Sequence, residues 1–200
     1  GADLSGASLR RANVAGVDLS AANIDEADLA EVLRAPPAVF YIDDRALTDV
    51  VDDHEAYCES QGRQGVLVNL AEVDFRPTRN LRGRRLSGLR APGAIFFGLD
   101  MSGAQLQGAD LCGADLRGAN LRKADLRGAR LIGAQLTRAD LREAILSPLT
   151  ISEGRFIRTD LTSAALRHAD LRYADLRNAR LLEADIGMAK LDGTNLRGAE

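Results

Sequence analysis

A five-residue repeat runs through most of this chain and limits the folds that it can adopt. In the stretch GADLRGANLRKADLRGARL, residues 113–131, alanine recurs every five residues and leucine follows two positions later. Taking the central apolar residue as position i, twenty-four centres follow one another from Leu81 to Leu196. Internal repetition of this kind indicates a stacked repeat architecture. An N-terminal array obeys the same rule, with centres at Leu4, Leu9, Val14, Leu19, Ile24 and Leu29.

The five-residue period fits neither the helical turn of 3.6 residues nor the plain alternation of a long strand. Each unit, here called a pentad, is interpreted as one short side of a coil. Positions i−2 and i point inward, i−1 and i+1 point outward, and i+2 turns the corner. Small alanine at i−2 suits a crowded interior, and leucine at i contributes about 1.5–3 kcal/mol when fully buried. Because Lys123, Glu143, Pro148 and Tyr173 occupy position i+2, we expect the corners not to require positive φ.

The runs AQLQGADLCGADLRGANLRKADLRGARL and AALRHADLRYADLRNARLLEADI resemble the pentapeptide repeat family, whose units read A-(D/N)-L-x-x. The resemblance covers about four-fifths of the chain. It implies an all-β solenoid, a right-handed quadrilateral parallel β-helix in which four pentads close one coil and coils stack about 4.8 Å apart. For function it implies little. Most members have no known activity, whereas a subset that includes quinolone-resistance proteins imitates DNA and binds gyrase.

Residues 34–65 depart from the pattern and are predicted to interrupt the solenoid with one amphipathic α-helix. Pro36 and Pro37 break the first array, Asp43-Asp44 offers an N-cap, and apolar residues then recur at helical spacing. We expect the apolar face of this helix to cover the start of the second array, because the ends of repeat stacks need covering. The predicted organisation is an N-terminal array at 1–33, a linker at 34–65 with its helix at about 44–60, and the main β-helix at 66–200. The main β-helix contains about six regular coils from residue 81, and one extra residue around Pro77 shifts its register.

Two arrangements of the arrays are compatible with the sequence. The six N-terminal centres together with Leu70 and Phe75 make eight, which is two full coils of one continuous solenoid. Against this arrangement, Arg79 and Arg84 fall at the inward position i−2, and a charge buried without partners destabilises a fold by several kcal/mol. At an end covered by the helix these side chains reach water. We therefore favour two stacked segments that meet at the helix.

The sequence predicts no catalytic residue, no cofactor and no metal site, so we do not expect an enzyme. His54 and Cys58 lie four residues apart beside Asp53, but two ligands are too few to hold a metal ion. His168 stands alone at a corner position, and the serines lack a base at a repeat-defined neighbouring position. Cys58 and Cys112 lie in unrelated segments, which favours a reducing cytoplasm over a disulfide framework.

The chain is interpreted as a fragment of a longer array that does not contact a membrane. It begins with Gly1 rather than Met and stops two residues into a new pentad. No apolar run approaches the roughly 20 residues of a membrane span. Coils without a cap at their end would also allow end-to-end self-association.

Charge separates the candidate functions. Residues 81–200 hold 19 Lys and Arg against 14 Asp and Glu, net +5, whereas residues 1–80 hold 7 against 15, net −8. A DNA mimic needs a sustained negative surface, which the positive balance of residues 81–200 does not provide. Nucleic-acid binding is disfavoured because acids interleave with the arginines and aromatics are only 4% of the chain. We expect a non-catalytic structural or protein-interaction module whose partner is another protein of unknown identity. A DNA-mimicking gyrase-binding protein is the alternative. Stacking residues twenty apart predicts one sign-mixed column: Arg90, Asp110, Arg130, Thr150, Asp170 and Lys190.

The repeat is least regular at SPLTISEGRF, residues 147–156. Leu149 and Gly154 replace alanine at i−2, and Ile145 and Ile157 occupy outward positions. The register holds across Pro148, which favours a distortion without an insertion. The other interpretation is an apolar contact surface, with candidate residues Ile132, Ile145, Leu149 and Ile157. Because Ile145 and Ile157 belong to different sides of the coil, they are not expected to form one continuous patch.

Overall fold

The computed structural model describes residues 2–15, 17, 19–20, 22–36 and 40–200. Pro37, one of the two prolines predicted to break the first array, lies outside the described residues. The chain divides into two compact units, Gly1–Ala38 and Val39–Glu200. Each unit is described by itself.

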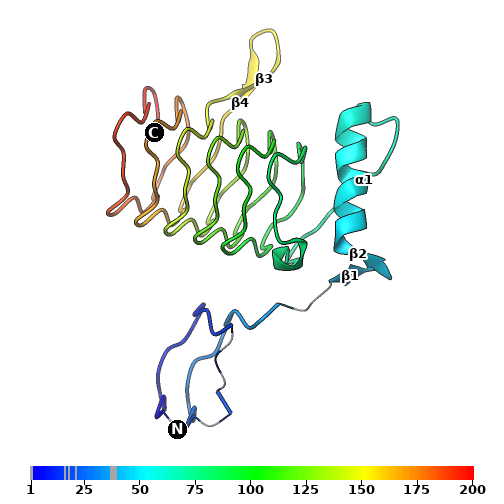
Figure 1. Ribbon diagram of the computed structural model, residues 1–200. Helices are drawn as coiled ribbons and strands as arrows, with labels where there is room; N and C mark the ends of the chain where they lie inside the picture. Colours follow the sequence, from blue (N-terminus) through cyan, green and yellow to red (C-terminus); the bar gives the residue numbers. More distant parts are fainter. Residues whose placement is uncertain (1, 16, 18, 21, 37–39) are drawn as a thin grey trace. The chain divides into compact units, whose positions relative to one another are not determined.

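Stacked coils of four pentads make up most of the second unit (Figure 1). Parallel bridges join residues twenty apart, from Asn80↔Asp100 through Asp125↔Ile145. Every side repeats the same hydrogen bonds. The Asp115 N–H donates to the Ala94 carbonyl of the preceding coil at 2.9 Å, and the Leu116 N–H donates to Gln135 of the following coil at 2.8 Å. Neighbouring coils are therefore joined as the strands of a parallel sheet are.

The inward positions are those that the period predicts. Leucine at position i and alanine at i−2 form one continuous core, and Leu116, Leu126 and Ala119 have no exposed surface. Phe75 and Phe96 stack inside the first coils with ring centroids 4.4 Å apart. The aliphatic, alanine-rich interior follows from the small space beside each corner.

The prediction for the corners was wrong. The Ala119 N–H donates to the Leu116 carbonyl, and Gly118, the third residue of this turn, has φ +65°, the positive value of a type II turn. Lys123 and Tyr173 adopt the same conformation, with φ of 59° and 61°, at about 1–2 kcal/mol for each residue that carries a Cβ. Hydrogen bonds to the coils on both sides hold them there. Within the main stack such corners concentrate in the later coils: Arg138, Glu143, Ser163, His168, Tyr173, Asn178, Glu183 and Met188.

The second unit begins with a short hairpin and a helix. Strands β1 (Tyr41–Ile42) and β2 (Arg45–Ala46) pair antiparallel across Asp43 and Asp44, whose φ values are 48° and 63°. The two aspartates form the tight turn, so the prediction that they cap the helix was wrong. Helix α1 (Leu47–Ser60) starts after Ala46 without a side-chain cap and ends at Gln61, which is left-handed.

Helix α1 covers the first coil of the stack. Its buried residues Leu47, Val50 and Val51 belong to the same core cluster as the coil residues. Arg84, at an inward position of the first coil, lies under the helix, and its guanidinium forms ion pairs with Asp52 at 2.5 Å and Glu55 at 2.6 Å. The acidic side chains of α1 thus neutralise the charge that the repeat places at this end.

One extra residue near Pro77 shifts the register, as the sequence predicts. Asp74↔Ile95 spans 21 residues, whereas Asn80↔Asp100 spans 20. The 3-10 helix η1 (Arg76–Thr78) accommodates the additional residue. From Asn80 on, equivalent positions of successive coils are twenty residues apart up to Ile145.

The first unit contains the same type of coil. Parallel bridges join Asp3↔Asn23, Ser8↔Asp28 and Asn13↔Leu33. Val14, Leu19, Ile24 and Leu29 face inward and line an open cavity of about 670 Å³. Gly16, Asp18 and Ala21, three further residues of this array, lie outside the described residues.

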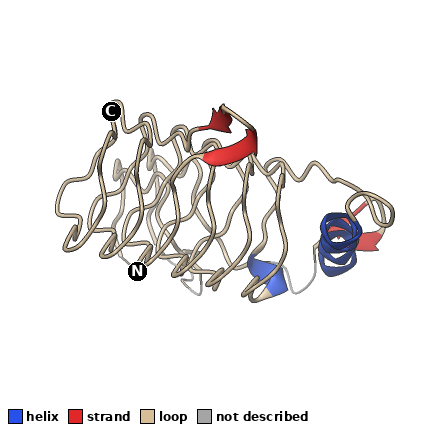
Figure 2. Ribbon diagram, turned by 90° about the horizontal axis from the view of Figure 1, so that it is seen from above, coloured by secondary structure: helices blue, strands red, loops and turns tan. Residues whose placement is uncertain are grey.

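A ten-residue insertion interrupts the main stack, so the prediction of a distortion without an insertion was wrong. The bridges Arg130↔Asp160 and Ile145↔Asp175 span 30 residues instead of 20. The pentads centred on Ile151 and Phe156 leave the stack as a hairpin of β3 (Leu149–Ser152) and β4 (Arg155–Ile157), seen from above in Figure 2. The predicted column is also wrong beyond Arg130, because Asp160 and Arg180 follow there in place of Thr150 and Asp170.

Candidate interaction surface

The inserted hairpin departs most from the regular coils of the main stack (Figure 1). Strands β3 and β4 pair antiparallel through Leu149↔Ile157, Thr150↔Phe156 and Ser152↔Arg155, with an irregularity at Ile151. Glu153 and Gly154 form the tip, and Gly154 has φ +70°. Two strands without further partners are marginal on their own in water, so their attachment to the coils decides whether the hairpin is ordered.

Corner glycines of the neighbouring coils receive the base of the hairpin. A Cβ on Gly128 would lie 2.7 Å from Leu149 Cβ and 3.4 Å from Ile157 Cβ. A Cβ on Gly108, one coil earlier, would lie 3.7 Å from Leu149 Cδ2. One face of the hairpin therefore packs closely on two corners that carry no side chain.

Thr159 closes the coil where the chain leaves it. The residue is completely buried. Its Oγ1 accepts the Gly128 N–H at 3.0 Å and donates to the Leu126 carbonyl at 3.0 Å. At the regular corner one coil earlier, Gly108 donates instead to the backbone carbonyl of Arg127. The hydroxyl group thus takes the place of a backbone group that the insertion removes.

The outer part of the hairpin exposes large apolar side chains. Ile151 and Phe156 are each 57% exposed, and Ile157 is 42% exposed. We call Ile151, Phe156 and Ile157 the hairpin surface. The period does not predict Ile151 and Phe156 as surface residues, because both occupy its central position, which points to the interior elsewhere. The signal that could have found them is the loss of alanine two positions earlier, at Leu149 and Gly154.

The four predicted surface residues lie in three places. Leu149 and Ile157 are paired in the hairpin. Ile145 is exposed on the side that precedes the hairpin corner, where it bridges to Asp125 and Asp175. Ile132 is partly buried on the side that follows this corner. The hairpin thus brings together two of the four.

Paired charges cover the regular sides of the stack. An aspartate at i−1 and an arginine at i+1 of the same pentad form an ion pair, for example Asp115 with Arg117 at 2.7 Å. The backbone N–H of Arg117 also donates to the Asp115 carboxylate. The Arg142 guanidinium lowers the pKa of Asp140, and the Arg172 guanidinium lowers that of Asp170. These charges are largely neutralised within their own pentads.

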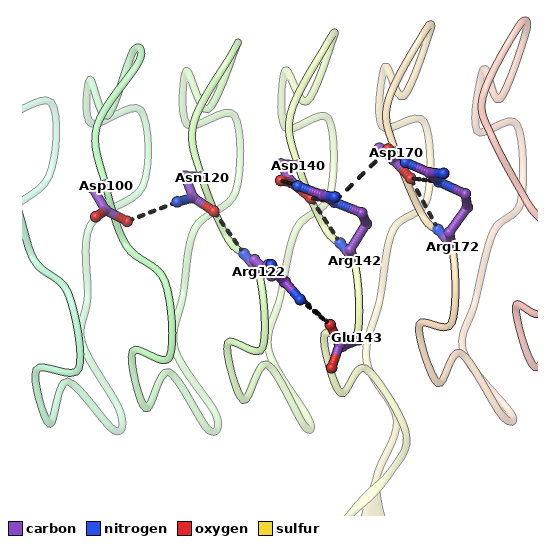
Figure 3. A network of polar contacts seen from close by, with 8 residues as sticks. All are labelled: Asp100, Asn120, Arg122, Asp140, Arg142, Glu143, Asp170 and Arg172. Atoms are coloured by element: carbon purple, nitrogen blue, oxygen red, sulfur yellow. Dashed lines mark hydrogen bonds and ion pairs between the residues drawn. The ribbon is translucent and has the colours of Figure 1, made fainter.

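The network continues from coil to coil (Figure 3). Asn120 donates to Asp100 at 3.0 Å, and Arg122 pairs with Glu143 at 2.6 Å. On another side, arginine and aspartate alternate along one column: Arg90, Asp110, Arg130, Asp160 and Arg180. These two sides of the stack therefore present mixed charge rather than charge of one sign.

The two cysteines and two histidines lie at three separate places in the second unit. Cys58 and Cys112 are free thiols, and the Cys58 Sγ donates to the Ser87 carbonyl at 3.4 Å. His54 is a buried residue of α1, and His168 is exposed at a corner with φ 58°. Within the described residues, no three His, Cys, Asp or Glu side chains gather as metal ligands. No helix in this part of the chain combines the length and the hydropathy that a membrane span requires.

Comparisons with known proteins agree with the coil geometry. The family description "Pentapeptide repeats" matches residues 1–32, 80–113, 113–147 and 159–198, in 8 copies, and the gap before residue 159 coincides with the hairpin. A comparison with curated proteins finds no match.

Several solved structures are similar. HetL, a pentapeptide repeat protein involved in heterocyst differentiation regulation in the cyanobacterium Nostoc sp. strain PCC 7120, is 28% identical over 99% of this chain and 88% of its own, with a TM-score of 0.36. A trypsin-treated variant of QnrB1, a plasmid-mediated fluoroquinolone resistance protein, is 24% identical over 60% of this chain, with a TM-score of 0.40. The match spans 61% of that QnrB1 chain. On the strength of the family match and the repeated coil, the chain belongs to the pentapeptide repeat family.

Proposed function

We propose that this chain is a non-catalytic protein-interaction module, in which a rigid right-handed β-helix presents the hairpin surface to another protein. The observation that carries the proposal is the exposure of Phe156 and Ile151 on an element that the coil does not need. A pentad in the stack buries its central residue, whereas these two central residues, each 57% exposed, face solvent. Aromatic and large aliphatic side chains of this kind commonly anchor protein interfaces.

The rest of the surface supports binding rather than chemistry. The coil faces carry arginine–aspartate pairs that satisfy one another, and exposed pairs of this type contribute only about 0–1 kcal/mol each. We further propose a cytoplasmic location, which the two free thiols support because thiols stay reduced in that compartment. The alternating charges along the coils disfavour DNA mimicry, which needs a continuous negative surface.

A comparative pull-down tests the proposal. Wild-type protein, the double variant Ile151→Ser/Phe156→Ser and the control Leu182→Ser are immobilised in parallel and exposed to a lysate of the source organism. Leu182 is 55% exposed on a regular side of the coil, so the control removes an exposed apolar side chain away from the hairpin. We expect a protein that wild type and control retain and the double variant loses, and that then binds purified wild type in a defined ratio. Equal capture by all three proteins would contradict a role for the hairpin surface.

We also propose that the last coil provides a contact for a second copy of the chain. Its central residues Ile186 and Leu196 are 41% and 39% exposed, although position i is buried elsewhere in the stack. Sedimentation at increasing concentration should detect a dimer that Leu196→Glu dissociates. A wild-type chain that stays monomeric at its highest soluble concentration would refute this contact.

A further inference from the structure

His54 lies on the face of α1 that covers the first coil, and it has 0% exposed surface. Val50 and Val51, three and four residues earlier, are buried on the same helix face, and Cys58 follows four residues later. Beneath the helix lie the central residues of the first coil, among them Leu70 and Leu86. An ionisable ring thus occupies the middle of an apolar contact between helix and stack.

Neither ring nitrogen of His54 has a hydrogen-bond partner. The carbonyl groups of Leu86 and Ser87 face the ring and favour its protonated form, but neither closes a hydrogen bond, and the Ser87 carbonyl already accepts the Cys58 thiol. Burying a polar group without a partner is unfavourable, and burying a charge is much more so. The contact between α1 and the first coil is therefore compatible with a neutral His54 ring and is destabilised by a protonated one.

Charged groups near the ring offer little compensation. On α1, Glu55 favours protonation, but its carboxylate and that of Asp52 are paired with Arg84 of the coil. The neighbouring Arg85 pairs with Glu59 at 3.3 Å, and Asp53 pairs with Arg45 of β2 at 2.7 Å. Arginine side chains of the coil and of β2 thus already neutralise these four acids of the helix. Loss of solvation outweighs these acids and lowers the pKa of His54.

We propose that α1 is a pH-released cap, in which protonation of His54 at mildly acidic pH detaches the helix from the first coil and exposes the apolar end of the stack. The released helix leaves Leu70, Phe75, Leu81 and Leu86 accessible, and all four are buried while the helix is docked. The end of the stack that α1 covers near neutral pH becomes an exposed apolar surface when the pH falls.

The sign of the effect follows from proton linkage. An undocked histidine titrates near its ordinary pKa of about 6.5, whereas the docked ring resists protonation. Docking is therefore strongest above this pH and weakens below it. Between pH 7.5 and pH 5, the undocked fraction rises by up to about 30-fold, the limit set by a docked ring that stays neutral. Side-chain carboxyl groups ordinarily titrate below this window.

Thiol labelling measures the release. Cys58 lies on α1 one turn after His54, and Cys112 lies on the coils, so the ratio of their labelling rates, measured by mass spectrometry, largely removes the pH dependence of the reagent. We expect the ratio to rise by up to about 30-fold from pH 7.5 to pH 5 in wild type, and to stay within about twofold in His54→Leu, which removes the titrating group. The control His168→Asn changes the other histidine at a corner that asparagine tolerates, and should behave as wild type. A flat wild-type ratio, or a rise that persists in His54→Leu, overturns the proposal.

Hydrogen exchange on the wild-type chain provides a test that does not depend on the folding of a variant. After correction for intrinsic exchange rates, amides of α1 should lose protection relative to those of residues 101–146 as the pH falls to 5. Unchanged relative protection between pH 7.5 and pH 5 overturns the proposal. A failure here would leave the hairpin surface unaffected, because the lysate comparison is made at neutral pH.

Discussion

Replacing Gly128 by alanine tests whether the hairpin is seated on the corners of the stack. Gly118 provides a matched control two sides away, because it has the same backbone conformation, with φ +65° against +66°. A Cβ on Gly118 would meet nothing within 4 Å, whereas a Cβ on Gly128 would lie 2.7 Å from Leu149 Cβ. The two substitutions share the backbone effect and differ in the contact with the hairpin.

The expected magnitudes follow from these two terms. Alanine at a left-handed corner destabilises by about 1–2 kcal/mol, which applies to both variants. At Gly128 the added methyl group overlaps Leu149, and forced overpacking adds about 1–3 kcal/mol. We therefore expect Gly118→Ala to lower the free energy of unfolding by about 1–2 kcal/mol and Gly128→Ala by about 2–5 kcal/mol.

Urea denaturation measures both free energies, and limited trypsin digestion at Arg155 reports on the hairpin itself. Arg155 is exposed near the hairpin tip, and cleavage of a native protein follows the population of its open form. Gly128→Ala should accelerate this cleavage, while Gly118→Ala should not. Equal free energies within about 0.5 kcal/mol, together with equal cleavage rates, would refute the packing of Leu149 on this corner.

Three further predictions address the core, the closure and the function. Leu126→Ala should destabilise the fold by about 2–5 kcal/mol because Leu126 has no exposed surface, and a change below about 0.5 kcal/mol in urea melts would refute its inward position. Thr159→Val should lower the unfolding free energy by about 1–3 kcal/mol, since the Gly128 N–H and the Leu126 carbonyl lose a buried partner; wild-type stability would show that the hydroxyl does not close the coil. The purified protein should leave gyrase supercoiling unaffected at micromolar concentration, and potent, salt-sensitive inhibition would restore the DNA-mimic alternative.

The pentad period predicts the coil because every fifth position meets the same environment. Alanine and leucine recur at i−2 and i, since the interior beside a corner admits only small and medium aliphatic groups, and the structure buries them there. Helical spacing also places Leu47, Val50, Val51 and His54 on one helix face, and α1 buries these four residues. The local sequence pattern is sufficient to predict the coil because each residue contacts the equivalent residues of the coils before and after it.

The hairpin could not be predicted from the period. Its ten residues are a multiple of five, so the phase at Thr159 is the same whether two pentads stay in the coil or leave it. The difference lies in vertical neighbours, where Arg130 meets Asp160 instead of Thr150. The corners were misjudged for a related reason. Residue preference disfavours positive φ for Lys123 or Tyr173, but hydrogen bonds from two coils impose it.

The uneven distribution of corner residues gives the stack a mechanical polarity. Glycine turns most corners up to Gly133, whereas Arg138 to Met188 are turned by residues that resist this conformation. In a repeat stack the stability of each coil depends on itself and its neighbours, so the later coils hold together less strongly by about 1–2 kcal/mol for each such corner. When the main stack is pulled from its two ends, extension should begin in these coils, and the coils with glycine corners under α1 should yield last. Optical-tweezer traces that show the opposite order would indicate that corner conformation does not set the strength of the coils.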